Sequence, residues 1–279
     1  MSTTTTVERR FEAHRPMRLY VENGSGLVHV TAHDTTEATV VVTGRDAEEV
    51  TITEVDGQLS VLAPQRRTGF FQGASSLEMQ ITVPATSEMM VKTGSADITV
   101  VGTVGPAQFK SGSGEVRLPE LAGPAQVETG SGDVVVEVAH AELRVKSGSG
   151  DVEVARAASA VAVSTGSGDV RLGTSQGPAV IKTGSGDLRI VDAGDDVSMA
   201  TGSGDMRIDT GRKGRFTMKG ASGDVEIGIP AGIPVWADIN TLSGQIRSDL
   251  DGAGQPEAGA DHVEVRAKTV SGDVILTQL

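Results

Sequence analysis

The feature that most constrains this chain is a short motif that returns at a fixed interval. The string Ser-Gly-Asp, or a close variant, recurs so that the sequence numbers of its serines differ by 18 at each of six successive steps. The serines of these copies are Ser95, Ser113, Ser131, Ser149, Ser167, Ser185 and Ser203. Later copies at Ser222, Ser243 and Ser271 follow at wider spacings of 19, 21 and 28, and a divergent early copy begins at Asn23 and ends at Val30. A period held this long predicts a solenoid in which equivalent residues stack.

Apolar residues recur in register with this motif. One column directly follows the acidic residue, a second lies two residues further on, and mostly charged residues lie between them. The first column is Val116, Val134, Val152, Val170, Leu188, Met206 and Val225, and the second is Leu118, Val136, Val154, Leu172, Ile190, Ile208 and Ile227. Such alternation, rich in β-branched residues, is typical of a half-buried strand. A third apolar column, four residues before the serines, predicts a shorter strand that enters the Gly-Ser-Gly bend.

These columns lead us to expect an all-β fold, a single-stranded parallel β-solenoid or β-roll with about 18 residues per coil. The crossover rule for parallel strands predicts a right-handed coil. The few aliphatic side chains of one coil cannot offset the entropy lost on ordering it. Each coil therefore depends on its neighbours for stability.

The organisation of the chain follows from where the period holds. We expect a disordered N-terminus at 1–10, irregular N-terminal β coils and a cap at 11–90, the regular solenoid at 91–228, and irregular C-terminal coils and a cap at 229–279. Terminal coils of solenoids are atypical because they must prevent the exposed edge strand from pairing with another chain. Trp236, which lies among prolines, is expected to close the core at its end.

Composition narrows the classes of function. The chain has 24 Lys+Arg against 37 Asp+Glu, and the resulting net charge of −13 argues against nucleic acid and anionic membranes as partners. Cysteine is absent, which excludes disulfides, thiolate zinc sites and cysteine nucleophiles. There is no apolar leader and no apolar run long enough to span a membrane, so we expect no membrane insertion and a cytoplasmic location.

An acidic residue closes most copies of the motif, so stacking predicts a ladder of carboxylates. Its members are Asp97, Glu115, Asp133, Asp151, Asp169, Asp187, Asp205, Asp224 and Asp273. Neighbouring carboxylates about 5 Å apart repel by roughly 1 kcal/mol in water, so some partner must offset the repulsion.

Two interpretations of this ladder remain open. The first is a set of calcium ligands, because calcium prefers oxygen donors; its residues would be Asp133, Asp151, Asp169, Asp187 and Asp205. However, the aspartate directly follows the second glycine and each repeat carries one motif only, unlike the calcium β-roll repeat. The second and favoured interpretation is structural, with each aspartate accepting hydrogen bonds from backbone amides at the bend.

Hydroxyl residues form a second ladder, two residues before each motif serine. Its members are Ser111, Thr129, Ser147, Thr165, Thr183 and Thr201. Stacked hydroxyls of this kind usually satisfy one another and the amides of the bend, so we expect a structural role.

The repeat resembles a known family. Units of sequence TGSGD begin at Thr129, Thr165, Thr183 and Thr201, and a Val-Pro-Ala segment begins at Val83. Nearly the whole chain, from about residue 11 to residue 279, resembles the bacterial β-strand-repeat proteins of unknown function that are often labelled "putative adhesin". The resemblance implies a β-solenoid or β-roll without established catalysis, and it supplies no catalytic residues.

Signatures of catalysis are scarce. The one GxSxG match, at 173–177, lacks the strand–turn–helix context of a nucleophile elbow. His29 and His33 lie four residues apart, which on a strand is about 13 Å and too far for both to bind one metal ion. The deviations from the repeat that could mark a site are His140, Asp192, Asp195, Asp196, Arg212, Lys213 and Arg215. We assign no catalytic, cofactor-binding or metal-binding residue to this chain.

The sequence therefore favours a non-enzymatic, adhesin-like scaffold or binding protein. Its partner would be a protein or polymer that the sequence does not name, without nucleic acid. The first alternative is a structural polymer that self-associates end to end, and the second is a calcium-binding β-roll. A carbohydrate-active enzyme that uses Asp195 and Asp196 is a further alternative, which the unbroken repeat disfavours.

Overall fold

The computed structural model describes residues 4–64, 76–250 and 261–279. They form two compact units, unit 1 at 1–141 and unit 2 at 142–279. Strands make up their regular structure apart from one short 3-10 turn, η1 (Ala47–Glu49). None of the described segments is a helix long and apolar enough to cross a membrane.

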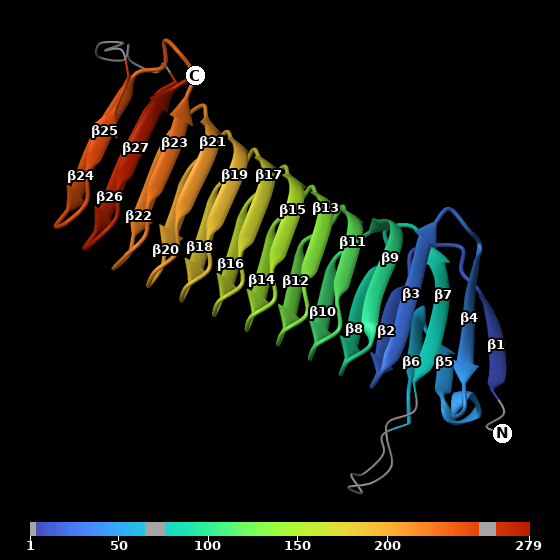
Figure 1. Cartoon of the computed structure of the whole chain (residues 1–279). Helices are drawn as coiled ribbons and strands as arrows, with labels where there is room; N and C mark the ends of the chain where they lie inside the picture. The colour runs from blue at the N-terminus through green and yellow to red at the C-terminus, as the bar shows by residue number, and fades with distance from the viewer. Residues whose placement is uncertain (1–3, 65–75, 251–260) are drawn as a thin grey trace, which may run out of the picture. The chain divides into compact units, whose positions relative to one another are not determined.

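Unit 1 contains two sheets, and Figure 1 shows their strands in blue to green. Sheet 1A has, in spatial order, β1 (Thr5–Glu12), β4 (Glu37–Gly44), β7 (Leu77–Pro84), β3 (Gly26–His33), β9 (Asp97–Val104), β11 (Val116–Leu121) and β13 (Val134–Ala139). Sheet 1B has β5 (Thr51–Val55), β6 (Gln58–Leu62), β2 (Arg18–Asn23), β8 (Glu88–Thr93), β10 (Ala107–Ser111) and β12 (Ala125–Thr129). The pairs β1–β4, β4–β7 and β5–β6 are antiparallel, and those from β2 and β3 onward are parallel.

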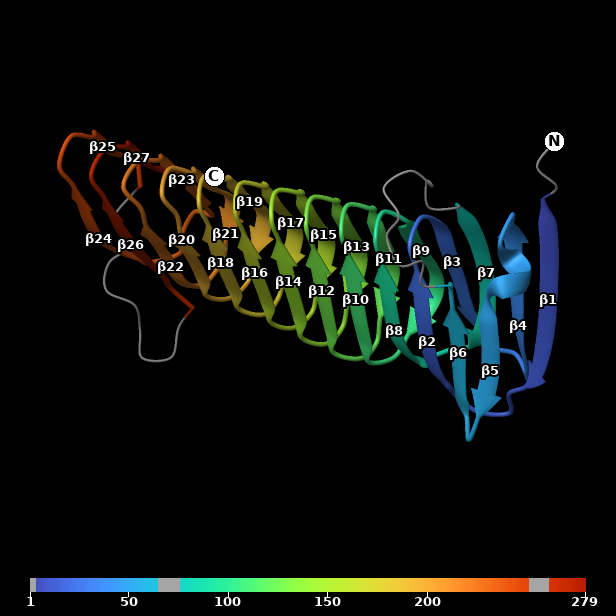
Figure 2. The ribbon, with the colours of Figure 1, turned by 90° about the horizontal axis from the view of Figure 1, so that it is seen from below.

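Unit 2 also contains two sheets, which lie on opposite sides of its coils (Figure 2). Sheet 2A has, in spatial order, β15 (Val152–Ala157), β17 (Val170–Ser175), β19 (Leu188–Ala193), β21 (Met206–Gly211), β23 (Val225–Ile229), β27 (Val274–Gln278) and β25 (Ile246–Ser248). Sheet 2B has β14 (Leu143–Ser147), β16 (Val161–Thr165), β18 (Ala179–Thr183), β20 (Val197–Ala200), β22 (Gly214–Lys219), β26 (Val263–Thr269) and β24 (Val235–Thr241). The strand pairs of unit 2 are parallel.

The apolar columns of the sequence form the core between the sheets. In sheet 2A, Val170 pairs with Leu188, and in sheet 2B, Val163 pairs with Ile181; all four are buried. Equivalent residues stack in register because a slip by one residue would turn the apolar set toward water. The predictions of an all-β chain and of parallel strands in long sheets are confirmed.

The Gly-Ser-Gly bends stack as closely as the strands do. A Cβ atom added to Gly186 would lie 2.0 Å from the carbonyl oxygen of Gly168, and one added to Gly184 would lie 2.5 Å from that of Gly166. Glycine is therefore required at both places by the backbone of the neighbouring bend. This close approach explains why the motif keeps two glycines.

The stacking order departs from the chain order near both ends of the chain. In unit 2, β26 lies between β22 and β24, and Ser222 bridges to Ser271, so the last coil is inserted before the coil of β24 and β25. In unit 1, β2 likewise lies between β6 and β8. The lengthening spacings of the sequence mark this reordering, although they do not reveal its pattern.

The N-terminal region also differs from expectation. Part of the segment expected to be disordered, residues 1–10, forms β1, which pairs with β4 over its whole length. Residues 37–55 supply β4 and β5 as antiparallel strands rather than looser coils of the same kind. Their alternating side chains bury one face only, which any edge strand can do without the repeat period.

Candidate binding surfaces of unit 2

The aspartates of the ladder stand where each bend enters sheet 2A, and they bind backbone groups. The N–H of Asp169 donates to Asp151 Oδ1 (2.8 Å), that of Asp187 to Asp169 Oδ1 (3.0 Å), and that of Asp205 to Asp187 Oδ1 (2.8 Å). The row continues in the same way. The N–H of Asp224 donates to Asp205, that of Asp273 to Asp224, and that of Gln245 to Asp273. Backbone amides are thus the partners, but they belong to the neighbouring coil rather than to the same bend.

This geometry bears directly on the calcium interpretation. One oxygen of Asp151, Asp169, Asp187 and Asp205 is already engaged by an amide. The second oxygens of Asp151 and Asp169 each accept from Arg171 at 3.1 Å. Among the described residues there is no group of three or more acidic or histidine side chains that could hold a metal ion. In unit 1, Asp97 likewise accepts from the N–H of Glu115 at 2.9 Å.

The hydroxyl ladder closes the bends from inside each coil. Thr165 Oγ1 accepts from the N–H of Gly168 (3.0 Å), whereas Ser147 Oγ donates to the carbonyl of Gly150 (2.9 Å). Both bonds tie the end of one strand to the turn that follows it. The expected structural role of the hydroxyls is therefore observed at the bend.

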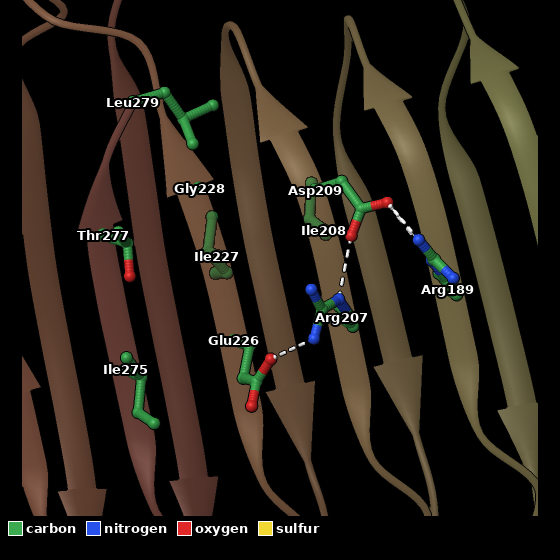
Figure 3. A pocket seen from close by; sticks show the side chains of 10 residues that line it. All are labelled: Arg189, Arg207, Ile208, Asp209, Glu226, Ile227, Gly228, Ile275, Thr277 and Leu279. Atoms are coloured by element: carbon green, nitrogen blue, oxygen red, sulfur yellow. Dashed lines mark hydrogen bonds and ion pairs between the residues drawn. The ribbon is translucent and has the colours of Figure 1, made fainter.

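The outer face of sheet 2A carries a row of charged side chains. Its residues in register are Glu153, Arg171, Arg189, Arg207 and Glu226. Three adjacent guanidinium groups would repel one another, so they need carboxylate partners. Arg189 and Arg207 both donate to Asp209, at 2.9 and 2.8 Å, and Arg207 also contacts Glu226 at 2.6 Å (Figure 3).

This network holds its members in their charged forms. Burial alone would raise the pKa of Asp209, but hydrogen bonds from Arg207 and Arg189 outweigh it and keep the pKa below the usual range. The hydrogen bond to Asp209 raises the pKa of Arg207, and the hydrogen bond to Asp151 raises that of Arg171. A general acid needs the opposite shift, so Asp209 is poor for proton transfer at neutral pH.

A hollow of about 380 Å³ lies over this network. Its lining includes Arg189, Arg207, Asp209, Glu226, Gly228 and Leu279 (Figure 3). A Cβ atom on Gly228 would lie 2.3 Å from the carbonyl oxygen of Asp209 and 3.0 Å from Leu279. The hollow combines fixed charges with an exposed leucine, as a binding surface does.

The other residues singled out by sequence form ion pairs or bind backbone groups. His140 contacts Glu120 at 3.0 Å, and Arg212 contacts Asp192 at 2.8 Å. Asp195 and Asp196 accept from the N–H groups of Asp196 and Arg215, so they bind backbone rather than forming an acid–base pair. Ser175 of the GxSxG match is 1% exposed and donates to the carbonyl of Gly177, which makes it a turn residue.

Trp236 does not close the core. Its side chain is 52% exposed on the outer face of β24, where the guanidinium of Arg266 lies 5.4 Å from the ring centroid. The expectation was wrong because Val235 and Ala237, rather than Trp236, take the inward positions opposite Val263 and Val265.

Sequence reasoning missed Asp209, Gly228 and Leu279. Gly173 and Val191 occupy the position of Asp209 in the two preceding repeats, so the carboxylate differs from the uncharged residues directly before it in this column. That difference was a usable signal. The position of Leu279 over Gly228 had no such signal, because the reordered last coil brings the two together.

Comparison with known proteins adds a family and a set of distant structures. The family model described as Toastrack DUF4097 matches residues 13–156 and 125–277. No curated protein matches the chain. Similar solved structures include a "putative lipid binding protein" from Parabacteroides distasonis (12% identity, TM-score 0.41, 98% of this chain and 96% of that one). Others are a "putative adhesin" from Parabacteroides merdae (12%, 0.35, 97% and 95%) and a "putative cell adhesion protein" from Clostridium sporogenes (11%, 0.24, 99% and 100%).

Proposed function

The chain belongs to the Toastrack DUF4097 family, and we propose that it is a non-enzymatic binding scaffold. Its coils would have about 18 residues each in the regular region, as the sequence period predicts, and would be right-handed, as the crossover rule predicts. A partner would lie along an outer face, because the interior is filled by the apolar columns. The outer face of sheet 2A, with its hollow, is the surface proposed for this role.

The observation that carries this proposal is the Arg189–Asp209–Arg207–Glu226 network. These four side chains are fixed by contacts of 2.6–2.9 Å and need no rearrangement to present charge to a partner. Preorganised groups lose little entropy on binding, which favours recognition. The same contacts keep Asp209 ionised, which disfavours a role as a catalytic acid.

A combined retention and product assay tests the proposal. The full chain is incubated with immobilised bacterial surface polysaccharides, and bound protein and released sugar are measured in the same samples. We expect retention without product, and weaker retention in R189Q/R207Q but not in R144Q, an arginine of sheet 2B paired with Glu142. Release of product that disappears in D195N/D196N would contradict the proposal and favour the carbohydrate-active enzyme.

A second candidate function, self-association, is favoured by the end of unit 2. Ile246 occupies the column of Val274, yet Ile246 is 53% exposed and Val274 is 0% exposed. Among the described residues, β24 and β25 each pair with one strand only. The inward residues of β24, Val235, Ala237 and Ile239, carry no charge, so no inward-pointing charge on this strand discourages pairing with another copy.

A further inference from the structure

A second hollow lies on the outer face of sheet 2B, and its charges are not balanced. It measures about 460 Å³ and is lined by residues of β22, β26 and β24, including Lys219, Lys268, Arg266, Asp238 and Asn240. In register, Lys219 pairs with Lys268 and Lys268 with Asn240, so the three form one row across the sheet. The neighbouring row on the same face, two residues earlier in each strand, contains Arg266 and Asp238.

The two lysines are the unusual feature of this hollow. Neighbouring strands lie about 4.8 Å apart, so the bases of two ammonium side chains stand side by side. Neither Lys219 nor Lys268 has an ion pair within the described ranges. By contrast, Arg215 and Arg266 on the same face share Glu264, at contacts of 2.5 Å each. Two adjacent, unpaired cations repel and favour an anion between them.

The charge around the hollow is opposite to that of the chain. Arg215, Lys219, Arg266 and Lys268 contribute +4, while Asp238 and the two acidic neighbours of Arg215, Glu264 and Asp196, contribute −3, so the local balance is +1. The chain as a whole carries −13. Long-range attraction therefore does not bring anions to this protein, and an anion that binds here must be recognised locally.

The other side of the hollow offers hydrogen-bond acceptors. Asp238 and Asn240 lie on the same outer face of β24 as Trp236, two and four positions further along the strand. Asp238 aligns with Arg266, but Arg266 contacts Glu264 and the Trp236 ring instead. The carboxylate of Asp238 and the amide oxygen of Asn240 can accept hydrogen bonds from hydroxyl groups.

We infer that this hollow binds an anionic sugar. Its carboxylate or sulfate would lie between Lys219 and Lys268, and its hydroxyls would donate to Asp238 and Asn240. A bare inorganic anion would use the lysines but be repelled by Asp238, so the sugar part decides the preference. The inference deepens the proposed binding role and rests on it, but it uses sheet 2B rather than sheet 2A.

Titration calorimetry of the full chain with three probes tests the inference. The probes are glucuronic acid, glucose and inorganic sulfate at matched ionic strength. We expect glucuronic acid to bind, glucose not to bind, and sulfate to bind more weakly. In K219Q/K268Q, binding of glucuronic acid should fall by about tenfold or more. In K182Q it should be unchanged, because Lys182 is on the same face in β18 and outside the hollow.

The D238N variant distinguishes recognition of the sugar hydroxyls from recognition of the anionic group. Losing the carboxylate should strengthen sulfate binding and weaken the preference for glucuronic acid over sulfate. Equal binding of sulfate and glucuronic acid in the wild type, or an equal loss in K182Q, would overturn the inference. If neither anion binds while polysaccharide retention persists through sheet 2A, the inference fails and the proposed function stands. Product release in the retention assay would instead defeat the proposed function.

Discussion

Each bend of unit 2 depends on glycines that leave room for the carbonyl of the neighbouring bend. Gly168 and Gly186 face the carbonyls of Gly150 and Gly168 at hypothetical Cβ distances of 2.1 and 2.0 Å. The period and the two glycines were visible in the sequence, and so was a bend. The partner of each aspartate was not visible, because the register of the ladder decides which amide an oxygen meets.

At this scale the sharpest substitution is Gly186→Ala. We expect it to lower the free energy of unfolding by about 1–3 kcal/mol, because the added methyl must displace a neighbouring backbone. Gly194→Ala is the matched control, since its Cβ would meet Ser175 O at an ordinary 3.4 Å. Denaturant unfolding of both variants decides the point, and equal stability of the two would contradict the close stacking of bends.

The ladder makes a separate residue-scale prediction. Asp187→Ala removes the acceptor of the N–H of Asp205, an exposed hydrogen bond, so it should cost about 0.5–1.5 kcal/mol. Asp187→Asn keeps an oxygen at that place and removes repulsion with Asp169 and Asp205, so it should be neutral or stabilising. Thermal melts compare the two variants, and an equal loss in both would show that charge, not the hydrogen bond, is what matters.

At the scale of elements, the strands of sheet 2A carry an ion-pair network rather than isolated pairs. Arg189 comes from β19, and Arg207 and Asp209 come from β21, so the contact of Arg189 with Asp209 depends on the register between the two strands. The alternation of the sequence predicted the strands and the outward position of the arginines. It could not predict which carboxylate each arginine would choose, because Asp187 and Asp209 lie within similar reach along the strands.

This network predicts a pH dependence. The pKa of Asp209 is held low in the folded state, so the unfolded chain binds a proton at higher pH than the folded chain does. The stability it contributes is therefore present above the unfolded pKa and is lost as pH falls, below about pH 4. We expect the melting temperature of D209N to fall less steeply with acid than that of the wild type. D238N, outside this network, should follow the wild type, and identical slopes in all three would refute the assignment.

At the scale of the whole molecule, the edge strands of unit 1 and of unit 2 differ in the charge of the residues that they point inward. In unit 1 the edge strands point charged residues inward: Arg9 of β1 lies opposite Val40, and Glu54 of β5 lies opposite Leu59. In unit 2 the edge strands point Val235, Ile239 and Ile246 inward. The sequence indicated atypical ends, but the insertion of β26 and β27 hid which strand would be the edge.

The open edge of unit 2 predicts association between copies. In sedimentation velocity, the average mass of the wild type should rise with concentration, because an uncharged edge can add another strand. I239K/I246K should remain monomeric, whereas T53K, which adds a lysine to β5 in unit 1, should behave as the wild type. A wild type that stays monomeric at every concentration would count against the second candidate function.

The central claim is that the carboxylate ladder binds backbone amides and serves structure, leaving the outer faces for binding. A thermal melt of chelator-stripped protein, with and without millimolar calcium and with magnesium as control, tests it most directly. An ion bound only by the folded state would raise the melting temperature. We predict no calcium-specific rise, because one oxygen of each of Asp151, Asp169, Asp187 and Asp205 is already engaged. A large calcium-specific rise, lost in D169N/D187N, would contradict the claim and make the ladder a metal site.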